Sequence, residues 1–570
     1  MPSCCLCCND PPNYVNGKPT VSGGDVISCF EDGRLFRVIK GKKWYYYNDT
    51  QESVMDVNVV FGVGSVIKAL GNTQIHQTDS SGAGVANLRV MPLETEPFIK
   101  GKPQGFNIIV SEESVTDEQK RMYMKTAHET VAKNMQKVRD VLKKAKEGAV
   151  AAMKNEDRAV YLCIKYKVSY VDMNFPPIAD SLRPSSDTST RNRRLENLND
   201  FAWRRPRDYL PRSWHKKIAL YRKKITPQSI DQGTLGDCWF LCSISALAEE
   251  PKNIRSLFLN PHWCCRKKQE RRAGAYRVTL NINGIWRTLI VDDYLPSTSK
   301  LPCFARSRHS PCDLWVSLLE KAYAKAYGSY AAISGGSPTY ALQDLTGFPS
   351  FYFKKLWNDA LKSSDSADKF FKLLHQWRHQ KYLITVDTPS EDVRSYSSRR
   401  RMSNIEADEV ERLYKKAGLA MGHAYTVLDV RHFPLHRLCM LKIRNPWAND
   451  VEWSGDWSDN SDMWKKYPII KALCRPEKKK DGVFWMEWKD VVKFFEDGCV
   501  CFYRPGRFEY RIPAVFDGEV PNIVLEVVVK KKKKFKAFVM LQQRETRGLP
   551  PGHPESQQTG LLITIFAADG

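Results

Sequence analysis

The sequence predicts a multidomain α+β protein, and three patterns support that prediction. Residues 29–112 carry short runs of alternating apolar and polar side chains between Gly, Asn and Asp turns, which is typical of a small antiparallel β domain. From Ser114 to Lys154, apolar residues recur with a period of about 3.6 among Lys and Glu, which predicts an amphipathic helix. Farther along, the apolar run from Cys238 to Leu247 predicts a buried helix, and the segment around His423 predicts a buried strand.

Composition narrows the class of protein. A chain of 570 residues with 42% hydrophobic side chains can build several packed domains. No apolar run reaches the roughly 18–20 residues of a membrane span, and the N-terminus lacks the basic and apolar regions of a secretory signal. Sixteen cysteines, mostly scattered singly, favour a reducing cytosol over a disulfide framework. There is no EF-hand spacing.

The charge balance indicates the kind of partner. The formal net charge is +24, which favours acidic partners such as an anionic membrane surface or the acidic tails of cytoskeletal proteins. No signature of a nucleic-acid-binding fold accompanies that charge, so we expect no nucleic acid partner. We expect a cytoplasmic protein with cytoskeletal or membrane association.

The first ten residues contain a cluster of four cysteines, Cys4, Cys5, Cys7 and Cys8. They are too crowded to ligate one zinc ion easily, and no matching Cys pair follows nearby. An N-terminal cluster of this kind predicts S-palmitoylation, while Pro2 excludes myristoylation. The alternative is a disordered tail with reactive thiols.

Cys238 is the first candidate for chemistry. It follows a tight glycine turn and begins the predicted buried helix, where the unpaired N–H groups of a helix N-terminus favour thiolate over thiol. Gln232, six residues upstream, can place its amide beside the backbone N–H of Cys238, and the two donors would form an oxyanion hole. The alternative interpretation is a buried cysteine in a core helix.

A nucleophilic cysteine needs a base, and the base needs a residue that orients it. His423 lies at the start of the predicted strand, and Asn445 lies at the end of another, followed by Trp447, which could shield an Asn–His hydrogen bond. Taken singly, the histidine could be a core residue and the Asn-Pro pair a simple turn. Gly335 and Gly336 could admit a substrate backbone at close range.

The order Cys, His, Asn resembles that of the calpains, which are papain-like cysteine peptidases. The resemblance extends from about Asp172 to Pro505, and the matching blocks include Gln232 to Leu241, Leu318 to Lys325, Gly422 to Tyr425, Asn445 to Trp447, Val451 to Asp459 and Asp481 to Met486. It implies a two-lobed protease core in which Cys238 is the nucleophile and His423 the base and later the acid. It further implies that Asn445 orients His423, Gln232 helps to hold the oxyanion, and Trp447 covers the Asn–His bond.

The resemblance also implies two calcium sites in the core, and this chain departs from both. Ser229 and Ala331 stand where the first site has acidic residues. The second site keeps Glu452, Asp459 and Asp481, but Val483 replaces an expected acid. We therefore expect that no cofactor is required and that calcium binds weakly; the alternative is that these acids are solvated loop carboxylates.

Six segments are expected on this basis. They are a Cys-rich tail (1–28), a β domain resembling that of kinetoplastid calpain-like proteins (29–112), a helical linker (113–170), two protease lobes (171–343 and 344–507) and a partial β-sandwich (508–570). Three strands are predicted in the last segment, at Ile523 to Val529, Phe535 to Gln543 and Leu561 to Phe566.

The expected function is an intracellular endopeptidase that makes limited cuts in proteins through a Cys-His-Asn triad, with weak or no calcium dependence. The alternative is a scaffold, associated with the cytoskeleton or membrane, that retains the calpain fold without turnover. A cysteine transferase on a similar core is a third reading.

Overall fold

The structure is a computed structural model. It describes residues 14, 19–21, 24–30, 33–50, 53–77, 84–114, 117–144, 155–185, 201–210, 212–260, 267–297, 301–389, 407–447, 452–479, 481–518, 520–521, 523, 525–526, 528, 537–549 and 553. The cysteine cluster at Cys4, Cys5, Cys7 and Cys8 and the predicted strand at Leu561 to Phe566 lie outside the described residues. The mixture of helices and sheets confirms the α+β class.

The chain divides into two compact units. The first comprises residues 1–130, 208–210 and 296–301, and the second comprises residues 131–207, 211–295 and 302–570. Helix α1 (Asp117–Lys143) begins in the first unit and ends in the second. The division thus falls inside a helix, whereas the sequence places a boundary at residue 112.

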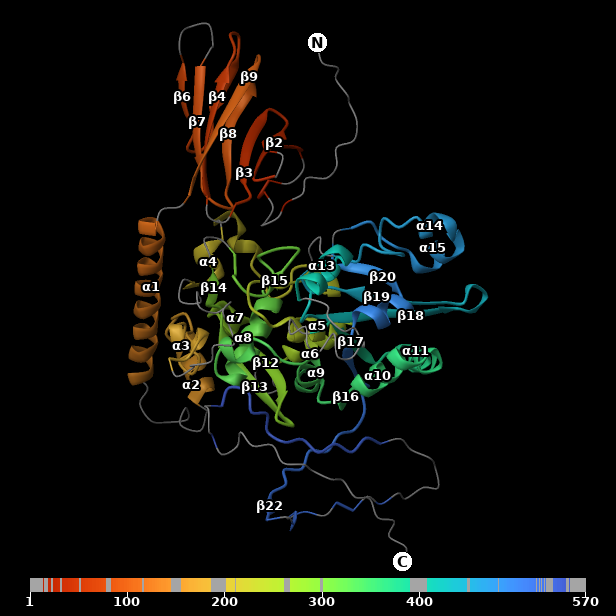
Figure 1. Ribbon diagram of the computed structural model, residues 1–570. Coiled ribbons are helices and arrows are strands. Elements are labelled where there is room, and N and C mark those ends of the chain that lie inside the picture. Colours follow the sequence, from red (N-terminus) through yellow and green to blue (C-terminus); the bar gives the residue numbers. More distant parts are fainter. Residues whose placement is uncertain are drawn as a thin grey trace, which may run out of the picture. The chain divides into compact units, whose positions relative to one another are not determined.

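The first unit contains two antiparallel sheets whose side chains share one core (Figure 1). In strand β4, alternate residues from Met55 to Phe61 are fully buried, as the period of a half-buried strand requires. One sheet has the order β1 (Asp25–Ser28), β2 (Leu35–Lys40), β3 (Lys43–Asn48), β8 (Thr95–Lys102), β5 (Val66–Ala69), and the other has the order β6 (Gln74–Gln77), β7 (Gly84–Val90), β4 (Ser53–Phe61), β9 (Phe106–Ser114).

Helix α1 has the buried stripe that its sequence period predicts. Val131, Met135 and Val138 pack into the core of the second unit at spacings of three and four residues. Met122, which the same period places on this stripe, is 70% exposed, so the stripe does not extend to the start of the helix. No helix among the described residues is both long enough and apolar enough to cross a bilayer.

The first core of the second unit surrounds helix α5 (Cys238–Leu247), in which every residue except Cys238 is buried. Helix α9 (Pro338–Thr346) packs against it, and α8 (Trp315–Tyr327) and the hairpin of β12 (Ala275–Ile282) and β13 (Ile285–Asp292) complete this core. The smaller elements of the unit are α2 (Asn155–Lys165), α3 (Ala179–Leu182), β10 (Ala202–Arg204), α4 (Pro206–Tyr209), β11 (Ile230–Asp231), α6 (Pro251–Leu257), α7 (Lys267–Arg272), β14 (Leu295–Ser297) and β15 (Arg306–Ser307).

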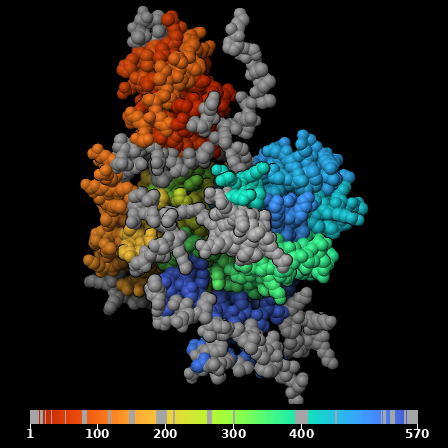
Figure 2. Space-filling view, viewed as in Figure 1, coloured from red at the N-terminus to blue at the C-terminus, as the bar shows by residue number. Residues whose placement is uncertain are grey.

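The second core of this unit lies on a six-stranded antiparallel sheet. Helices α10 (Lys354–Lys362), α11 (Ser364–His379), α13 (Ala407–Ala417) and α16 (Trp488–Phe494) bury their apolar residues in it, and the outer surface of α10 and α11 is the green region of Figure 2. The sheet order is β16 (Ser350–Tyr352), β21 (Asp497–Cys501), β17 (Leu383–Asp387), β18 (Ala424–Phe433), β19 (Leu438–Arg444), β20 (Val483–Glu487), with α14 (Met463–Lys466) and α15 (Pro468–Cys474) in a satellite cluster.

The C-terminal segment differs from its prediction. The described residues within Ile523 to Val529 and within Phe535 to Gln543 form no strand. The strands found beyond residue 507 are the two-residue pair β22 (Phe516–Asp517) and β23 (Val520–Pro521). The apolar runs that suggested strands leave Leu525, Val528 and Phe538 more than half exposed, so they do not have the covered face that a sandwich strand requires.

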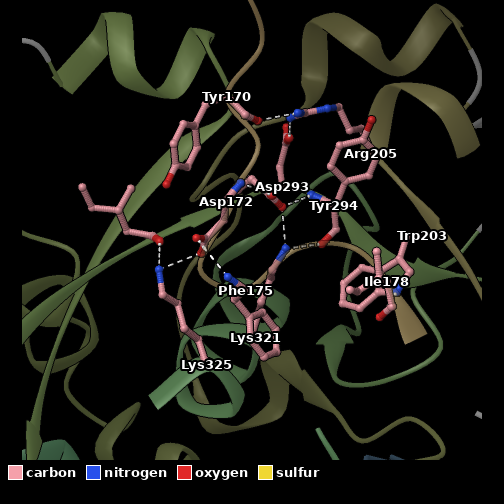
Figure 3. Close-up of polar contacts among 12 residues, drawn as sticks. Tyr170, Asp172, Phe175, Ile178, Trp203, Arg205, Asp293, Tyr294, Lys321 and Lys325 are labelled. Atoms are coloured by element: carbon pink, nitrogen blue, oxygen red, sulfur yellow. Dashed lines mark hydrogen bonds and ion pairs between the residues drawn. The ribbon is translucent and has the colours of Figure 1, made fainter. Parts of the chain in front are cut away.

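A buried ionic network ties the entry segment of the second unit to helix α8 (Figure 3). Lys325 donates from Nζ to Asp172 Oδ2 at 2.7 Å and to the Ile290 carbonyl at 2.7 Å. The side chain of Lys325 is 7% exposed and that of Asp172 is fully buried. Lys321 pairs in the same way with Asp292, and both of these side chains are fully buried. These charged groups are buried, so only their pairing with one another offsets the free-energy cost of removing them from water.

We expect Lys325→Met to destabilise the protein by about 3–5 kcal/mol at neutral pH, because it leaves the Asp172 carboxylate buried without its cation. Burial already raises the pKa of Asp172 to about 6, against the lowering effect of Lys325. Without Lys325 the folded-state pKa rises further, so the destabilisation should shrink at pH 4.5, where the unfolded carboxyl also binds protons. Denaturant unfolding at the two pH values measures both effects.

Lys369→Met is the matched control, because Lys369 forms an exposed ion pair with Asp365 one helical turn away. It should leave the unfolding midpoint unchanged. A Lys325→Met variant as stable as the control at neutral pH would contradict the account of the network.

Candidate active site

Cys238 is the first residue of helix α5 and the one residue of that helix that is only partly buried. Asp237 precedes it as the N-cap, with φ −110° and ψ 30°. Trp239 is anchored by its indole N–H, which donates to the Ile333 carbonyl at 3.1 Å. The helix is therefore held rigidly in the core with its N-terminal thiol at the surface of that core.

The surroundings of Cys238 oppose the thiolate that a helix N-terminus is predicted to favour. Burial, together with the charges of Asp237 and Asp387, raises the pKa of Cys238 to about 12. Hydrogen bonds from the backbone N–H groups of Ala424 and Trp239 act in the opposite direction but do not offset the burial. A thiolate here needs a positive charge beside it.

Asp237 forms an unusual pair with Glu320 of helix α8. Both side chains are buried, and neither carboxylate oxygen of Asp237 has a hydrogen-bond partner among the described residues. Burial raises the pKa of Asp237 to about 7, and burial together with the charge of Asp237 raises the pKa of Glu320. The backbone N–H of Ala305 donates to Glu320 at 3.0 Å. Burial therefore favours the neutral form of both carboxyls and limits the negative charge next to Cys238.

His423 and Asn445 meet across two neighbouring strands. His423 directly precedes β18 and Asn445 directly follows β19, so the antiparallel pairing of these strands brings the two side chains together. His423 Nε2 and Asn445 Oδ1 are 2.8 Å apart. An amide oxygen can only accept, so Nε2 carries the proton and Nδ1 is the basic nitrogen of the ring. His423 is 4% exposed and Asn445 is fully buried.

The backbone brings His423 close to Cys238. The N–H that bonds to the Cys238 thiol belongs to Ala424, the next residue after His423. Thr426, two residues farther along β18, donates from its hydroxyl to the Cys242 carbonyl at 2.8 Å. The start of β18 is therefore fastened to the first turns of α5, and the sequence-predicted Cys238, His423 and Asn445 lie in one neighbourhood.

Two further contacts fix the imidazole. The Trp447 ring lies 4.4 Å from the His423 ring, centroid to centroid, and the Trp447 backbone N–H donates to Asn445 Oδ1 at 3.0 Å. Thr388 holds the backbone of His423, because its Oγ1 accepts from the His423 N–H at 3.0 Å and donates to the His423 carbonyl at 3.1 Å. Sequence reasoning identified Trp447 and missed Thr388, which lies 35 residues away in the chain.

Gln232 lies next to the triad but makes a contact that the sequence did not predict. Its Nε2 donates to the Leu235 carbonyl at 2.7 Å, and its buried Oε1 has no hydrogen-bond partner among the described residues. Its backbone N–H donates to the Pro446 carbonyl at 3.3 Å. Because an amide nitrogen has two protons, the second remains for an oxyanion.

Arg444 joins the two cores of the unit immediately before Asn445. Its Nη1 donates to the Ser245 hydroxyl at 2.9 Å, and its Nη2 donates to the Ile230 carbonyl at 2.6 Å. The side chain is fully buried, and burial lowers its pKa to about 9. The sequence signal for this residue is an arginine at the end of the apolar strand Leu438–Arg444, which the analysis above did not use.

The first expected calcium position does not fit a calcium ion. The Ser229 hydroxyl accepts from the Thr226 N–H at 3.1 Å and donates to the Lys224 carbonyl at 3.0 Å, so it closes a local turn. Ala331 begins a short 3-10 helix and has no side-chain oxygen. Neither residue supplies the carboxylate charge that calcium sites rely on.

The second expected position keeps its three carboxylates. Glu452, Asp459 and Asp481 each accept a backbone N–H, at 2.6, 3.3 and 3.1 Å respectively. Burial raises the pKa of Glu452 to about 7 and that of Asp459 to about 6, and the charge of Asp481 raises both. In the part of the chain that the structure describes, no three His, Cys, Asp or Glu side chains are grouped closely enough to hold a metal ion. The three carboxylates could supply the negative charge of a calcium site, but their side chains are not grouped closely enough to form one.

The glycine pair expected to receive substrate is in contact with the C-terminal segment. Arg547 Nη1 donates to the Gly335 carbonyl at 2.7 Å and to the Ala332 carbonyl at 3.0 Å. Its guanidinium carbon lies 4.4 Å from the centre of the Trp239 ring. A substrate backbone that bonds to Gly335 would therefore compete with Arg547.

We expect His423→Ala to slow alkylation of Cys238 by iodoacetamide at pH 7 by about tenfold or more, because the buried thiol then has no neighbouring imidazole to take its proton. Peptide mapping of the alkylated protein measures the rate at this cysteine. His432→Ala is the control, since His432 lies exposed on the same strand. Equal slowing in both variants, or none in either, would contradict the assignment of His423.

Two family models match the chain. Residues 170–502 match the calpain family of cysteine proteases, and residues 14–115 match a domain of unknown function, DUF1935. A solved structure, SMP-1 (Small Myristoylated Protein) from Leishmania major, is 38% identical, covers 21% of this chain and 92% of its own, and has a TM-score of 0.19.

Curated relatives match over the same protease region. "Calpain-type cysteine protease ADL1" from Oryza sativa subsp. japonica is 34% identical over 370 residues, which are 64% of this chain and 16% of that protein. The calpain-1 catalytic subunit of Rattus norvegicus is 30% identical over 354 residues, 61% of this chain and 44% of that protein. The chain thus spans less than half the length of these relatives. Since the protease family model covers more than half of its 570 residues, the chain belongs to the calpain family of cysteine proteases.

Proposed function

We propose that this chain is a cysteine endopeptidase with Cys238, His423 and Asn445 as its catalytic triad. The observation that carries the proposal is the 2.8 Å contact between His423 Nε2 and Asn445 Oδ1, which leaves Nδ1 as the base next to the residue that touches the thiol. A plain core histidine would not need a buried amide to fix its tautomer. The family to which the chain belongs supports the same chemistry.

The reaction begins with proton transfer from Cys238 Sγ to His423 Nδ1. The resulting imidazolium supplies the positive charge that the buried thiolate requires. The thiolate attacks the peptide carbonyl carbon, and the backbone N–H of Cys238 and the second Nε2 proton of Gln232 receive the oxyanion. His423 then protonates the leaving amine as the C–N bond breaks, which leaves a thioester on Cys238.

Water completes the cycle. His423 Nδ1 takes a proton from the attacking water, the second tetrahedral intermediate collapses, and the carboxylic acid product leaves as the proton returns to Cys238. Asn445 and Trp447 keep the imidazole in one orientation throughout, because one accepts from Nε2 and the other packs on the ring. Thr388 also holds His423 in place, through hydrogen bonds to the backbone N–H and carbonyl of His423.

Calcium is proposed to have little influence on this site. The position of Ser229 and Ala331 lacks carboxylates, and Arg444 already joins the two cores through Ser245 and Ile230. Glu452, Asp459 and Asp481 would hold a calcium ion if one binds, and the ion would supply charge that offsets their mutual repulsion. Alignment of the triad would then depend on protein contacts more than on the metal.

The substrates are proposed to be proteins cut at a small number of accessible extended segments. The cellular setting is proposed to be the cytoplasm, with the chain's net charge of +24 favouring acidic cytoskeletal or membrane surfaces. Acylation of Cys4, Cys5, Cys7 and Cys8 would strengthen membrane association.

A scaffold without turnover is the second candidate. Two observations favour it, because both oppose catalysis. The pKa of the Cys238 thiol is raised, and Arg547 is hydrogen-bonded to the Gly335 carbonyl where a substrate backbone would bind. The two functions differ in whether peptide bonds are broken, which the following experiment decides.

The purified chain should cleave an unstructured protein substrate in EGTA, and Cys238→Ala should reduce the rate by roughly a thousandfold or more because the nucleophile is lost. Cys439→Ala is the matched control, since Cys439 is a partly exposed cysteine on β19 outside the site. Gel analysis and product mass spectra report the cuts. Absence of cleavage by a folded wild-type chain, with and without calcium, would favour the scaffold.

Calcium dependence is tested in the same assay with Glu452→Gln and Asp481→Asn. Wild type and both variants should respond to calcium by no more than about threefold if protein contacts align the triad. A large activation of wild type that both substitutions abolish would show that these carboxylates bind a required ion.

Arg547→Ala should lower KM by roughly threefold or more with kcat little changed, because a substrate backbone no longer displaces the guanidinium from Gly335. Steady-state kinetics on a fluorogenic peptide measure both constants. Arg544→Ala, three residues away on the same segment, should behave as wild type. A KM that is the same in all three proteins would contradict the competition.

A further inference from the structure

Arg37 is a buried cation in the interior of the first unit. It lies on β2 opposite Tyr46 of β3, and Tyr46 points into the shared core of the two sheets. Arg37 is 7% exposed, and its Nε and Nη1 have no hydrogen-bond partner among the described residues. No ion pair involves it in the described part of the chain. The polar group that interacts with it is the hydroxyl of Tyr46, whose pKa burial raises, so that it is neutral.

Two aromatic rings enclose the guanidinium. Its central carbon lies 4.6 Å from the centre of the Trp44 ring and 4.6 Å from that of the Phe106 ring. Each such contact stabilises a desolvated cation by about 2 kcal/mol, whereas removing an ion from water costs several kcal/mol. The rings orient the guanidinium but do not neutralise it. The guanidinium therefore has no counter-ion among the described residues. An anion with two adjacent oxygen atoms can bind a guanidinium through two parallel hydrogen bonds.

A cavity opens at this arginine. Its volume is about 310 Å³, and it lies between strands of the two sheets, with Ile108 and Val110 of β9 on one side and Ile27 and Ser28 of β1 on the other. Phe30 and Cys29 complete the lining with Arg37. Burial raises the pKa of Cys29 to about 11, so the thiol brings no negative charge to the cavity. The lining thus combines apolar side chains with the polar groups of Ser28 and Cys29 and one cation, Arg37.

We propose that this cavity binds a small amphiphile, with its carboxylate on Arg37 and its apolar body along Ile27, Phe30, Ile108 and Val110. Small-molecule sites commonly combine a volume of this size with mostly apolar walls and a single orienting charge. The function of this site is independent of proteolysis, because every residue that lines it belongs to the first unit and the triad belongs to the second.

Isothermal titration of the full chain with decanoate, decanol and decyl phosphate tests the proposal. Decanoate should bind at least about tenfold more tightly than decanol, which has the same chain without the charge. Decyl phosphate distinguishes the head group, since tighter binding of the phosphate would assign the site to phosphate esters and overturn the carboxylate. Equal binding of all three would also overturn the proposal.

Variants at the arginine separate binding from structure. Arg37→Met should weaken decanoate binding by at least about tenfold and leave the ligand-free unfolding temperature equal or higher, because it removes a buried charge that has no anion. Arg89→Met is the control, since Arg89 is an exposed arginine of the same unit that pairs with Glu113. Destabilisation by Arg37→Met would reveal a structural partner for the arginine and overturn the proposal.

Location is tested at Cys29. Decanoate should slow alkylation of Cys29, followed by peptide mapping, because the ligand would fill the cavity that this thiol lines. Alkylation of Cys439, which lies in the second unit, should proceed at an unchanged rate. Binding of decanoate without protection of Cys29 would place the ligand elsewhere and contradict the assignment.

Discussion

Burial of Arg444 is the constraint on which the proposed catalytic arrangement depends. The residue ends the strand that delivers Asn445, and its guanidinium bonds to Ser245 in the nucleophile's helix and to the carbonyl of Ile230. It is fully buried, with its pKa lowered to about 9, so both hydrogen bonds must form if the charge is to be tolerated there. Any movement that separates the two cores of this unit would leave that cation without partners. The geometry of the proposed triad therefore depends on these two hydrogen bonds, because their loss would leave a buried charge without partners.

The electrostatics of the site follow from the same burial. A helix N-terminus does not by itself ionise Cys238, because desolvation and the carboxylates of Asp237 and Asp387 oppose it. Burial raises the pKa of Asp237 and that of Glu320, which favours the neutral forms of both carboxyls near the thiol. The positive charge must come from His423, and Asn445 and Thr388 keep that ring and its backbone in place. In the proposed mechanism, activation of Cys238 therefore depends on the Cys238–His423 pair and not on the helix alone.

Local patterns in the sequence were sufficient to predict these helices and strands and to find the residues on which the family resemblance rests. The glycine turn before Cys238, the 3.6-residue period of α1 and the alternation of β4 all depend on neighbours within a few positions. Thr388, Glu320 and Arg444 escaped notice because their partners are 35, 83 and 199 residues away, where no spacing rule applies. After residue 520, apolar composition predicted strands, whereas the described residues of those runs form none and leave Leu525 and Val528 more than half exposed.

The central claim is that protein contacts, rather than a metal ion, align the triad. The most direct test is the rate at which a peptidyl epoxide labels Cys238 in the wild-type chain, measured in EGTA and in calcium and located by peptide mapping. This account predicts rates that agree within about twofold, because an ion that does not favour the aligned state shifts nothing. Labelling that occurs only in calcium, or a folded chain in which Cys238 stays unlabelled under both conditions, would contradict it.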